Sequence, residues 1–176
     1  MQESERRALF ESVVTGQLHA QAWAYATRLC RTREDAEDLL QDALARAYAS
    51  LHQLRQPELV RSWLFAILRA QSINRTRRAP LDLAATWWFQ SALARDYQQP
   101  LTDPLARALA QLSPEQREVL TLFYLDGLSL AETGRVLRCS AQAVGQRLHR
   151  ARQALRRRLT ALAPAPPAVE GQTNEA

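Results

Sequence analysis

The order of apolar and polar positions along the chain is helical almost throughout. Apolar side chains recur at intervals of three and four residues, and the alternation typical of strands is absent. In the first half this pattern predicts helices over about 5–29, 33–51 and 58–78, with a loop at 52–57 and a stop at Pro80. The inward positions of the second and third helices are expected to be Ala36, Leu39, Leu40, Ala43, Leu44, Ala47, Trp63, Leu64, Ile67, Leu68 and Ile73.

Helix-capping residues mark where the helices of the second half of the chain begin and end. Residues 113–116 (SPEQ) combine an N-cap serine, a first-turn proline and a capping-box glutamine, and Gly127 is placed to end that helix. Ser129 opens a short helix to about Leu137, and Ser140 caps a long one to about Leu162. Two helices joined by a three-residue turn predict a helix-turn-helix.

These elements predict an all-α fold of two small helical domains joined by a flexible linker. We expect the first domain at 1–79, the linker at 80–104, the second domain at 105–162 and a disordered tail at 163–176. Within the linker, Trp87, Trp88 and Phe89 are unusual for a free tether. A short helix docked on a neighbouring domain is the favoured interpretation, and contact with a partner is the alternative.

Basic charge is concentrated in two parts of the chain. All 23 basic residues are arginine, and the formal net charge is +5. Residues 1–80 carry 12 arginines against 9 acidic residues and 105–162 carry 10 against 4, whereas 81–104 carry 1 against 3. Because arginine is a forked, permanently charged group, it suits phosphate oxygens and base edges. Two basic surfaces separated by an acidic segment therefore favour a polyanionic partner such as DNA.

The sequence has no pattern typical of secretion, membrane insertion or metal binding. The acidic, polar N-terminus does not resemble a signal peptide, and no run of about 18 apolar residues occurs. Cys30 and Cys139 lack a CxxC motif and a histidine at metal-ligand spacing, so we expect reduced, buried cysteines rather than a disulfide. These features predict a cytoplasmic protein without a metal or another cofactor.

The last helix has an apolar stripe and an opposite polar face. The stripe consists of Val144, Leu148, Ala151, Leu155 and Leu159. An α-helix fits the major groove, where arginine pairs with guanine and glutamine with adenine, and the N-terminal part of such a helix reads bases. A solvated surface is the alternative, which we disfavour because no acidic residue lies between Glu132 and Glu170. Contacts with bases or nearby phosphates are therefore assigned to Gln142, Gln146, Arg147 and Arg150.

The second half resembles region four of bacterial RNA polymerase sigma factors, and the first half resembles region two. The resemblance to region four rests on residues 112–120 (LSPEQREVL), 124–129 (YLDGLS) and 147–152 (RLHRAR), and it is strongest to the extracytoplasmic-function (ECF) group. It implies binding of the promoter's minus-thirty-five element and of the flap of the polymerase β subunit. It also implies an anti-sigma factor as a possible further partner.

Region two is represented by residues 35–42 (DAEDLLQD), which match the family's motif for docking on the clamp of the polymerase β′ subunit. Two alternatives exist for these acids: a favourable effect on the helix dipole, and a metal site formed by Asp35, Asp38 and Asp42. By resemblance, the polymerase-binding residues are Asp35, Glu37, Asp38, Leu39, Gln41 and Asp42.

Residues 63–69 (WLFAILR) resemble the segment that opens and reads the minus-ten element. The resemblance implies a pocket for unstacked bases, built by loop 52–57 and the exposed face of the third helix. Trp63 itself is expected mainly in the core. The DNA contacts on this side are assigned to Arg69, Asn74, Arg75, Arg77 and Arg78.

Some positions depart from the family pattern, and two other functions are alternatives to a sigma factor. Ala70, Thr133, Gly134 and Gly145 differ from residues common in the family, which affects expectations for promoter melting and promoter sequence. A stand-alone helix-turn-helix regulator would explain the second half but not the acidic helix of the first. A metal-dependent nuclease lacks a phosphate loop or a nucleophile–base pair, so we expect no catalytic residues.

Overall fold

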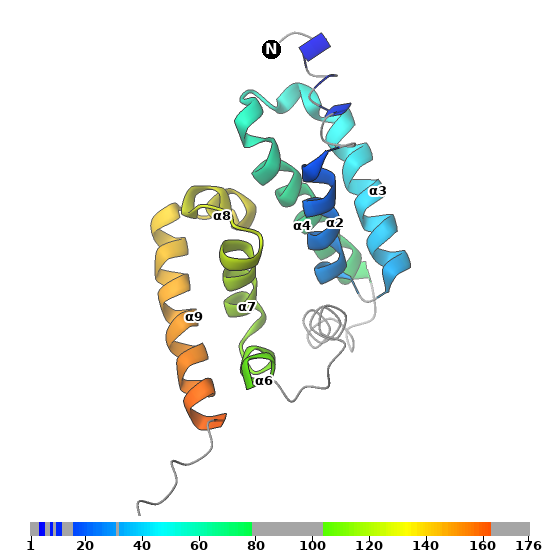
Figure 1. The fold of residues 1–176 in the computed structure, drawn as a ribbon. Coiled ribbons are helices and arrows are strands. Elements are labelled where there is room, and N and C mark those ends of the chain that lie inside the picture. Colours follow the sequence, from blue (N-terminus) through cyan, green and yellow to red (C-terminus); the bar gives the residue numbers. More distant parts are fainter. Residues whose placement is uncertain are drawn as a thin grey trace, which may run out of the picture.

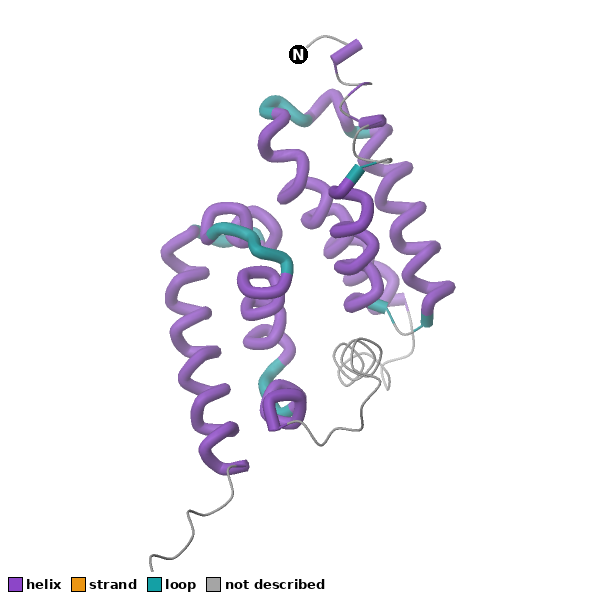
Figure 2. The backbone as a smooth tube through the Cα atoms, viewed as in Figure 1, coloured by secondary structure: helices purple, strands orange, loops and turns teal. Residues whose placement is uncertain are grey.

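The computed structural model describes residues 16–30, 32–78 and 104–162, and before them residues 4, 5, 8, 10 and 11. For residues 76–78 it describes the backbone alone. The described part is helical, without a strand (Figure 2). Linker residues 81–103, with Trp87, Trp88 and Phe89, and the predicted tail lie outside the described residues.

The first bundle consists of α2 (Gln17–Leu29), α3 (Arg33–Ala49) and α4 (Val60–Arg78), which pack against one another (Figure 1). Two short 3₁₀ turns, η1 (Leu51–Gln53) and η2 (Pro57–Leu59), connect α3 to α4. Thr32 caps α3 by accepting a hydrogen bond from the Asp35 amide at 3.0 Å. The predicted second and third helices are thus confirmed to within two residues at each end.

Most of the inward positions that the sequence predicts are buried in the core of the first bundle: Ala36, Leu39, Leu40, Ala43, Ala47, Leu64 and Leu68. Tyr25 and Phe65, which were not among the predicted positions, are fully buried too, and their rings are stacked with centroids 4.6 Å apart. Two expectations are wrong. The predicted first helix does not run unbroken, because Gly16 is an extended N-cap ahead of α2. Ile73, expected to point inward, is exposed near the end of α4.

The second bundle consists of α6 (Pro104–Ala110), α7 (Pro114–Leu120), α8 (Leu130–Leu137) and α9 (Ala141–Leu162), with α9 packed against the other three (Figure 1). The capping boxes at Ser113 and Ser129 are both formed. Ser140 accepts a hydrogen bond from the Ala143 amide at 3.1 Å. The helix-turn-helix of α8 and α9 is confirmed, whereas α6 was not predicted as a helix.

The helix that begins at Pro114 changes its hydrogen bonding before it ends. Residues Thr121–Leu125 form a π-helical turn, in which the Asp126 amide donates to the Thr121 carbonyl at 3.0 Å. Gly127 then adopts a left-handed conformation with φ 62°, as expected for the terminating residue. This irregular turn places Asp126 where it faces the first bundle, as its ion pair with Arg28 shows.

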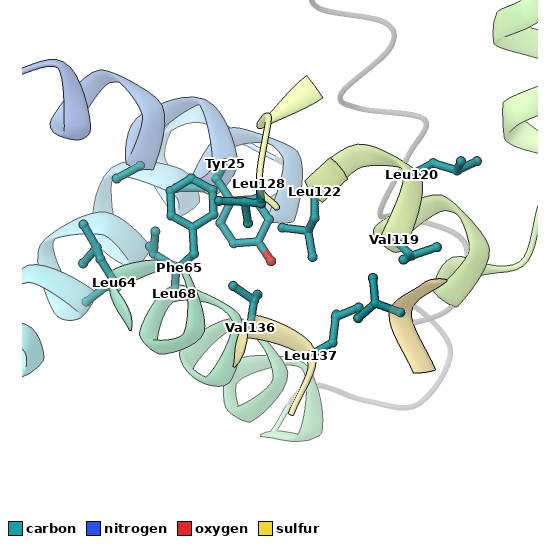
Figure 3. Close-up of a cluster of buried hydrophobic side chains, with 14 of the residues drawn as sticks. Tyr25, Leu64, Phe65, Leu68, Val119, Leu120, Leu122, Leu128, Val136 and Leu137 are labelled. Atoms are coloured by element: carbon teal, nitrogen blue, oxygen red, sulfur yellow. The ribbon is translucent and has the colours of Figure 1, made fainter. Parts of the chain in front are cut away.

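The two bundles share one hydrophobic core. α4 packs against α8, and a single cluster of buried apolar residues extends through both bundles. Figure 3 shows Leu122 and Leu128 of the second bundle beside the Tyr25 ring of the first. The two domains that the sequence predicts are therefore closed on each other in this structure.

The turn between α8 and α9 depends on an unusual pair of residues. Arg138 is left-handed, with φ 54°, and ends α8, although it is not a glycine. The glycine lies instead at Gly134, whose backbone comes so close to the turn that a Cβ would lie 2.6 Å from the Cys139 carbonyl oxygen. Gly134 and Arg138 therefore act together, because Gly134 leaves space for the turn and Arg138 adopts the conformation that the turn requires.

Two alanine substitutions in this motif are expected to change stability in opposite directions. Gly134→Ala should destabilise the fold by about 1–3 kcal/mol, because the new methyl group meets backbone. Gly145→Ala should stabilise it by about 0.5–1 kcal/mol, because a Cβ there meets nothing within 4 Å and alanine loses less backbone entropy in a helix. Thermal unfolding followed by circular dichroism checks both. A melting temperature of Gly134→Ala equal to or above that of the wild type would contradict the close approach at Gly134.

Candidate functional site

The polar face of α9 lies in the open, as the sequence predicts. Val144, Leu148 and Ala151 are almost completely buried and hold the helix against the second bundle. Gln142, Gln146, Arg147 and Arg150, together with His149 and Gln153, are exposed. The capped turn before α9 fixes the angle at which this face is presented.

Side chains on this face also contact one another. The Arg150 Nε donates to the Gln146 carbonyl at 3.4 Å, and the Gln153 amide lies 2.9 Å from the His149 ring nitrogen. Six arginines and no acidic residue occur within α9. The face is therefore basic over its whole length, with amide groups for base edges at its N-terminal end.

The acidic residues of α3 form a second exposed surface. Asp35, Glu37, Asp38, Gln41 and Asp42 are all exposed on this helix. Leu39, which resemblance assigned to polymerase contact, is completely buried in the core. A direct contact between Leu39 and the polymerase is therefore wrong for this structure, because the whole side chain is packed inside the bundle.

Two arginines neutralise part of the acidic surface of α3. Arg33 donates from Nε to Glu37 at 2.9 Å, and Arg75 of α4 forms an ion pair with Asp42. Asp35 and Asp38 are exposed and have no ion pair among the described residues, so their charges are available to a partner. In the described part of the chain, no three His, Cys, Asp or Glu side chains are close enough to hold a metal ion together.

A cavity of about 400 Å³ lies between the α3–α4 connection and α4. It occurs where the resemblance implies a pocket for unstacked bases. Trp63, expected mainly in the core, is half-buried and lines this cavity. The other lining residues are Gln53, Leu54, Arg55, Gln56, Leu59, Ser62, Ala66 and, from the second bundle, Arg135.

The structure separates the residues predicted to bind the minus-ten side. Asn74 is exposed, and Arg75 is paired with Asp42. Arg69 is directed toward the second bundle, where its Nε and Nη2 donate to the two carboxylate oxygens of Glu118 at 2.6 and 3.1 Å. The side chains of Arg77 and Arg78 lie outside the described residues.

A polar cluster between the two bundles was not predicted. Arg28 of α2 forms an ion pair with Asp126, and Arg61 of α4 donates to the Asp126 backbone carbonyl. Burial raises the pKa of Asp126 from 3.8 to about 6, although Arg28 and Arg61 act in the opposite direction. No sequence pattern marks this cluster, because the partners are 98 and 65 residues apart along the chain.

Both cysteines lie outside disulfides, and each is half-buried rather than buried. The cysteine thiol of Cys30 donates to the Asp35 carbonyl at 3.4 Å. None of the described helices has the length and apolar character needed to cross a membrane.

Two protein-family models match the chain. The model for "Sigma-70 region 2" matches residues 16–80, and the model for "Sigma-70, region 4" matches residues 102–155. The first match covers the first bundle, and the second covers α6, α7, α8 and the N-terminal part of α9.

Individual relatives cover most of the chain. SigM, an ECF RNA polymerase sigma factor of Mycobacterium tuberculosis, is 34% identical over 142 residues, which cover 80% of this chain and 72% of SigM. SigW, an ECF RNA polymerase sigma factor of Bacillus subtilis, is 29% identical over 148 residues, covering 75% and 79%.

Solved structures have the same fold. The structure of CnrH in complex with the cytosolic domain of CnrY matches with a TM-score of 0.62 and 29% identity, over 88% of this chain and 89% of the matched chain. The sigma factor RpoE in complex with the anti-sigma factor NepR, from Bartonella quintana, matches with a TM-score of 0.57 and 22% identity, over 92% and 98%.

Proposed function

The chain belongs to the ECF group of RNA polymerase sigma factors, which bind core polymerase and direct it to promoters, and we propose that three surfaces of this chain divide that work. The acidic surface of α3 docks on core polymerase, the cavity beside α4 captures a base of the minus-ten element, and the exposed face of α9 reads the minus-thirty-five element. The observation that carries the proposal is the presence, in one chain, of an exposed acidic helix face and an exposed arginine–glutamine helix face. The chain acts by recruitment in the cytoplasm, without covalent chemistry of its own.

Docking through α3 is supported by the accessibility of its charges. Asp35, Asp38 and Asp42 recur at intervals of three and four residues, so they share one side of the helix. Glu34 and Asp35 lie in the first turn, where they also favour the helix dipole, but Asp38 and Asp42 lie beyond that turn. The helix dipole does not account for Asp38 and Asp42. A basic partner helix, as the family implies for the β′ clamp, does account for them.

Capture of an unstacked base is supported by the shape and composition of the cavity. Trp63 offers an aromatic ring, and Gln53 and Gln56 offer amide groups that can donate to and accept from a base edge. Arg55 adds a positive charge at the same site, suited to the backbone of the melted strand. The cavity thus combines the three kinds of contact that a flipped base and its phosphate require.

Reading of the upstream element is tested by comparing two arginines of α9. Arg150 lies in the N-terminal half on the exposed face, and Arg157 lies two turns farther on. Arg150→Ala should cost about 1–3 kcal/mol with the preferred element and relax preference at one base position, if the contact is bidentate to guanine. Arg157→Ala should weaken all sequences about equally and lower the salt slope by about one unit or less.

The measurement is binding of each variant to a library of upstream elements at two salt concentrations. An unchanged base preference for Arg150→Ala would show that this residue does not read sequence. If both variants lost a small and equal amount of affinity for every sequence, the exposed face of α9 would be only a solvated surface.

A further inference from the structure

Three arginine side chains of the first bundle donate hydrogen bonds to oxygen atoms of the second bundle. Arg28 binds the Asp126 carboxylate, Arg61 the Asp126 carbonyl and Arg69 the Glu118 carboxylate. We propose that Arg28, Arg61 and Arg69 form a surface that binds the phosphate backbone of the promoter. In the closed arrangement Asp126 and Glu118 cover this surface, with their oxygen atoms in the place of phosphate oxygens. This inference rests on the proposed function, because it places the surface beside the minus-ten cavity.

The chemistry of the contacts is that of phosphate recognition. Arg69 engages Glu118 through two parallel N–H···O contacts of 2.6 and 3.1 Å, the geometry with which arginine also grips a phosphate. Arg61 donates from its Nη2 to a backbone carbonyl oxygen that carries no net charge, so this contact does not give its guanidinium an anionic acceptor. An anionic oxygen from outside the chain would therefore be a stronger partner for Arg61 than the carbonyl.

The closed arrangement leaves polar atoms in this cluster without partners. The Nε atoms of Arg28 and Arg61 and the Oδ2 of Asp126 are buried without a hydrogen bond, and the side chains of Arg28 and Asp126 are only 13% and 5% exposed. Each such atom destabilises the closed arrangement, because it has lost its hydrogen bonds to water without gaining a partner. Apolar residues would stabilise a permanent interface at least as well as buried charges do. The charges therefore fit a reversible contact better than a fixed one.

The position of the arginines matches the proposed path of DNA. Arg61 directly precedes Ser62 and Trp63, which line the base cavity. Arg69 lies eight residues farther along α4, which is about 12 Å along the helix axis. That length corresponds to about three or four nucleotides of one strand at 3.4 Å each. The second bundle covers both features together, because Arg135 of α8 also lines the cavity.

The experiment measures binding of the full-length chain to a fluorescent forked DNA, without core polymerase, over a range of salt concentrations. Glu118→Gln removes the charge that replaces phosphate and should tighten binding about three- to tenfold. Glu115→Gln is the matched control, because it removes the same charge from an exposed position on α7. Arg61→Gln and Arg69→Gln should each weaken binding about three- to tenfold and lower the salt slope by about 0.9 unit.

Each outcome decides between a DNA surface and a purely structural contact. Tightening by Glu118→Gln but not by Glu115→Gln, with weakening by both arginine variants, supports the proposal. Equal effects of the two glutamate variants, or unchanged binding in both arginine variants at unchanged melting temperature, would overturn it. If the wild-type chain did not bind core polymerase or the upstream element, the proposed function would be overturned instead. The result with forked DNA would still decide whether the arginines bind DNA.

Discussion

Asp38→Arg is expected to lower the affinity of the chain for core RNA polymerase by about ten- to a hundredfold. Asp38 is exposed in the middle of the acidic surface of α3, and no described residue pairs with it. An arginine there would face a basic partner with like charge, which costs several kcal/mol at an interface, and about 1.4 kcal/mol corresponds to a factor of ten. Titration of labelled chain with core polymerase measures the change.

Two measurements keep this prediction specific. Glu58→Arg, an exposed charge reversal in η2 of the same bundle, should leave core affinity unchanged. Binding of Asp38→Arg to the upstream element should equal that of the wild type, because α9 lies in the other bundle. If Asp38→Arg bound core polymerase as tightly as the wild type, the acids of α3 would serve the helix dipole and not docking.

Filling the cavity beside α4 is expected to remove most of the melted promoter complex. Ala66 lines the cavity, so Ala66→Phe directs a ring into the space that the proposed function gives to an unstacked base. Loss of base stacking is worth about 1–3 kcal/mol per base, which corresponds to about a five- to a hundredfold loss of open complex. Permanganate footprinting of the holoenzyme on promoter DNA reports the melted bases.

The control for cavity filling is a phenylalanine that points elsewhere. Ala20 is exposed on α2 and does not line the cavity, so Ala20→Phe should leave the footprint unchanged. Core affinity should be the same for both variants. A normal footprint for Ala66→Phe in a stably folded chain would exclude the cavity as the site of base capture.

The features predicted correctly from sequence are those that local physics determines. The capping boxes at Ser113 and Ser129 and the left-handed Gly127 are set by residues at most three positions apart. The buried stripe of α9 follows from helical periodicity, and that stripe fixes which residues of the helix are exposed. Most of the α9 face could therefore be placed before the structure was known.

The features that sequence did not predict depend on contacts distant along the chain. The cluster around Asp126 joins residues of α2 and α4 to the residue that follows the π-helical turn, and no local pattern marks that turn. Leu39 was assigned by motif to a partner, although its own periodicity predicted burial, and the periodicity was right. The direction of Arg69 toward Glu118 depends on how the bundles close, which only the folded chain determines.

Promoter-dependent transcription by core polymerase tests the central claim most directly. Core polymerase is mixed with the purified chain and a library of promoter fragments, and the transcribed sequences and their start points are read. The account predicts enrichment of one two-part sequence, with starts at a fixed distance downstream, and loss of these transcripts with Asp38→Arg. Binding of the chain to upstream DNA without specific starts, or starts unaffected by Asp38→Arg, would contradict it.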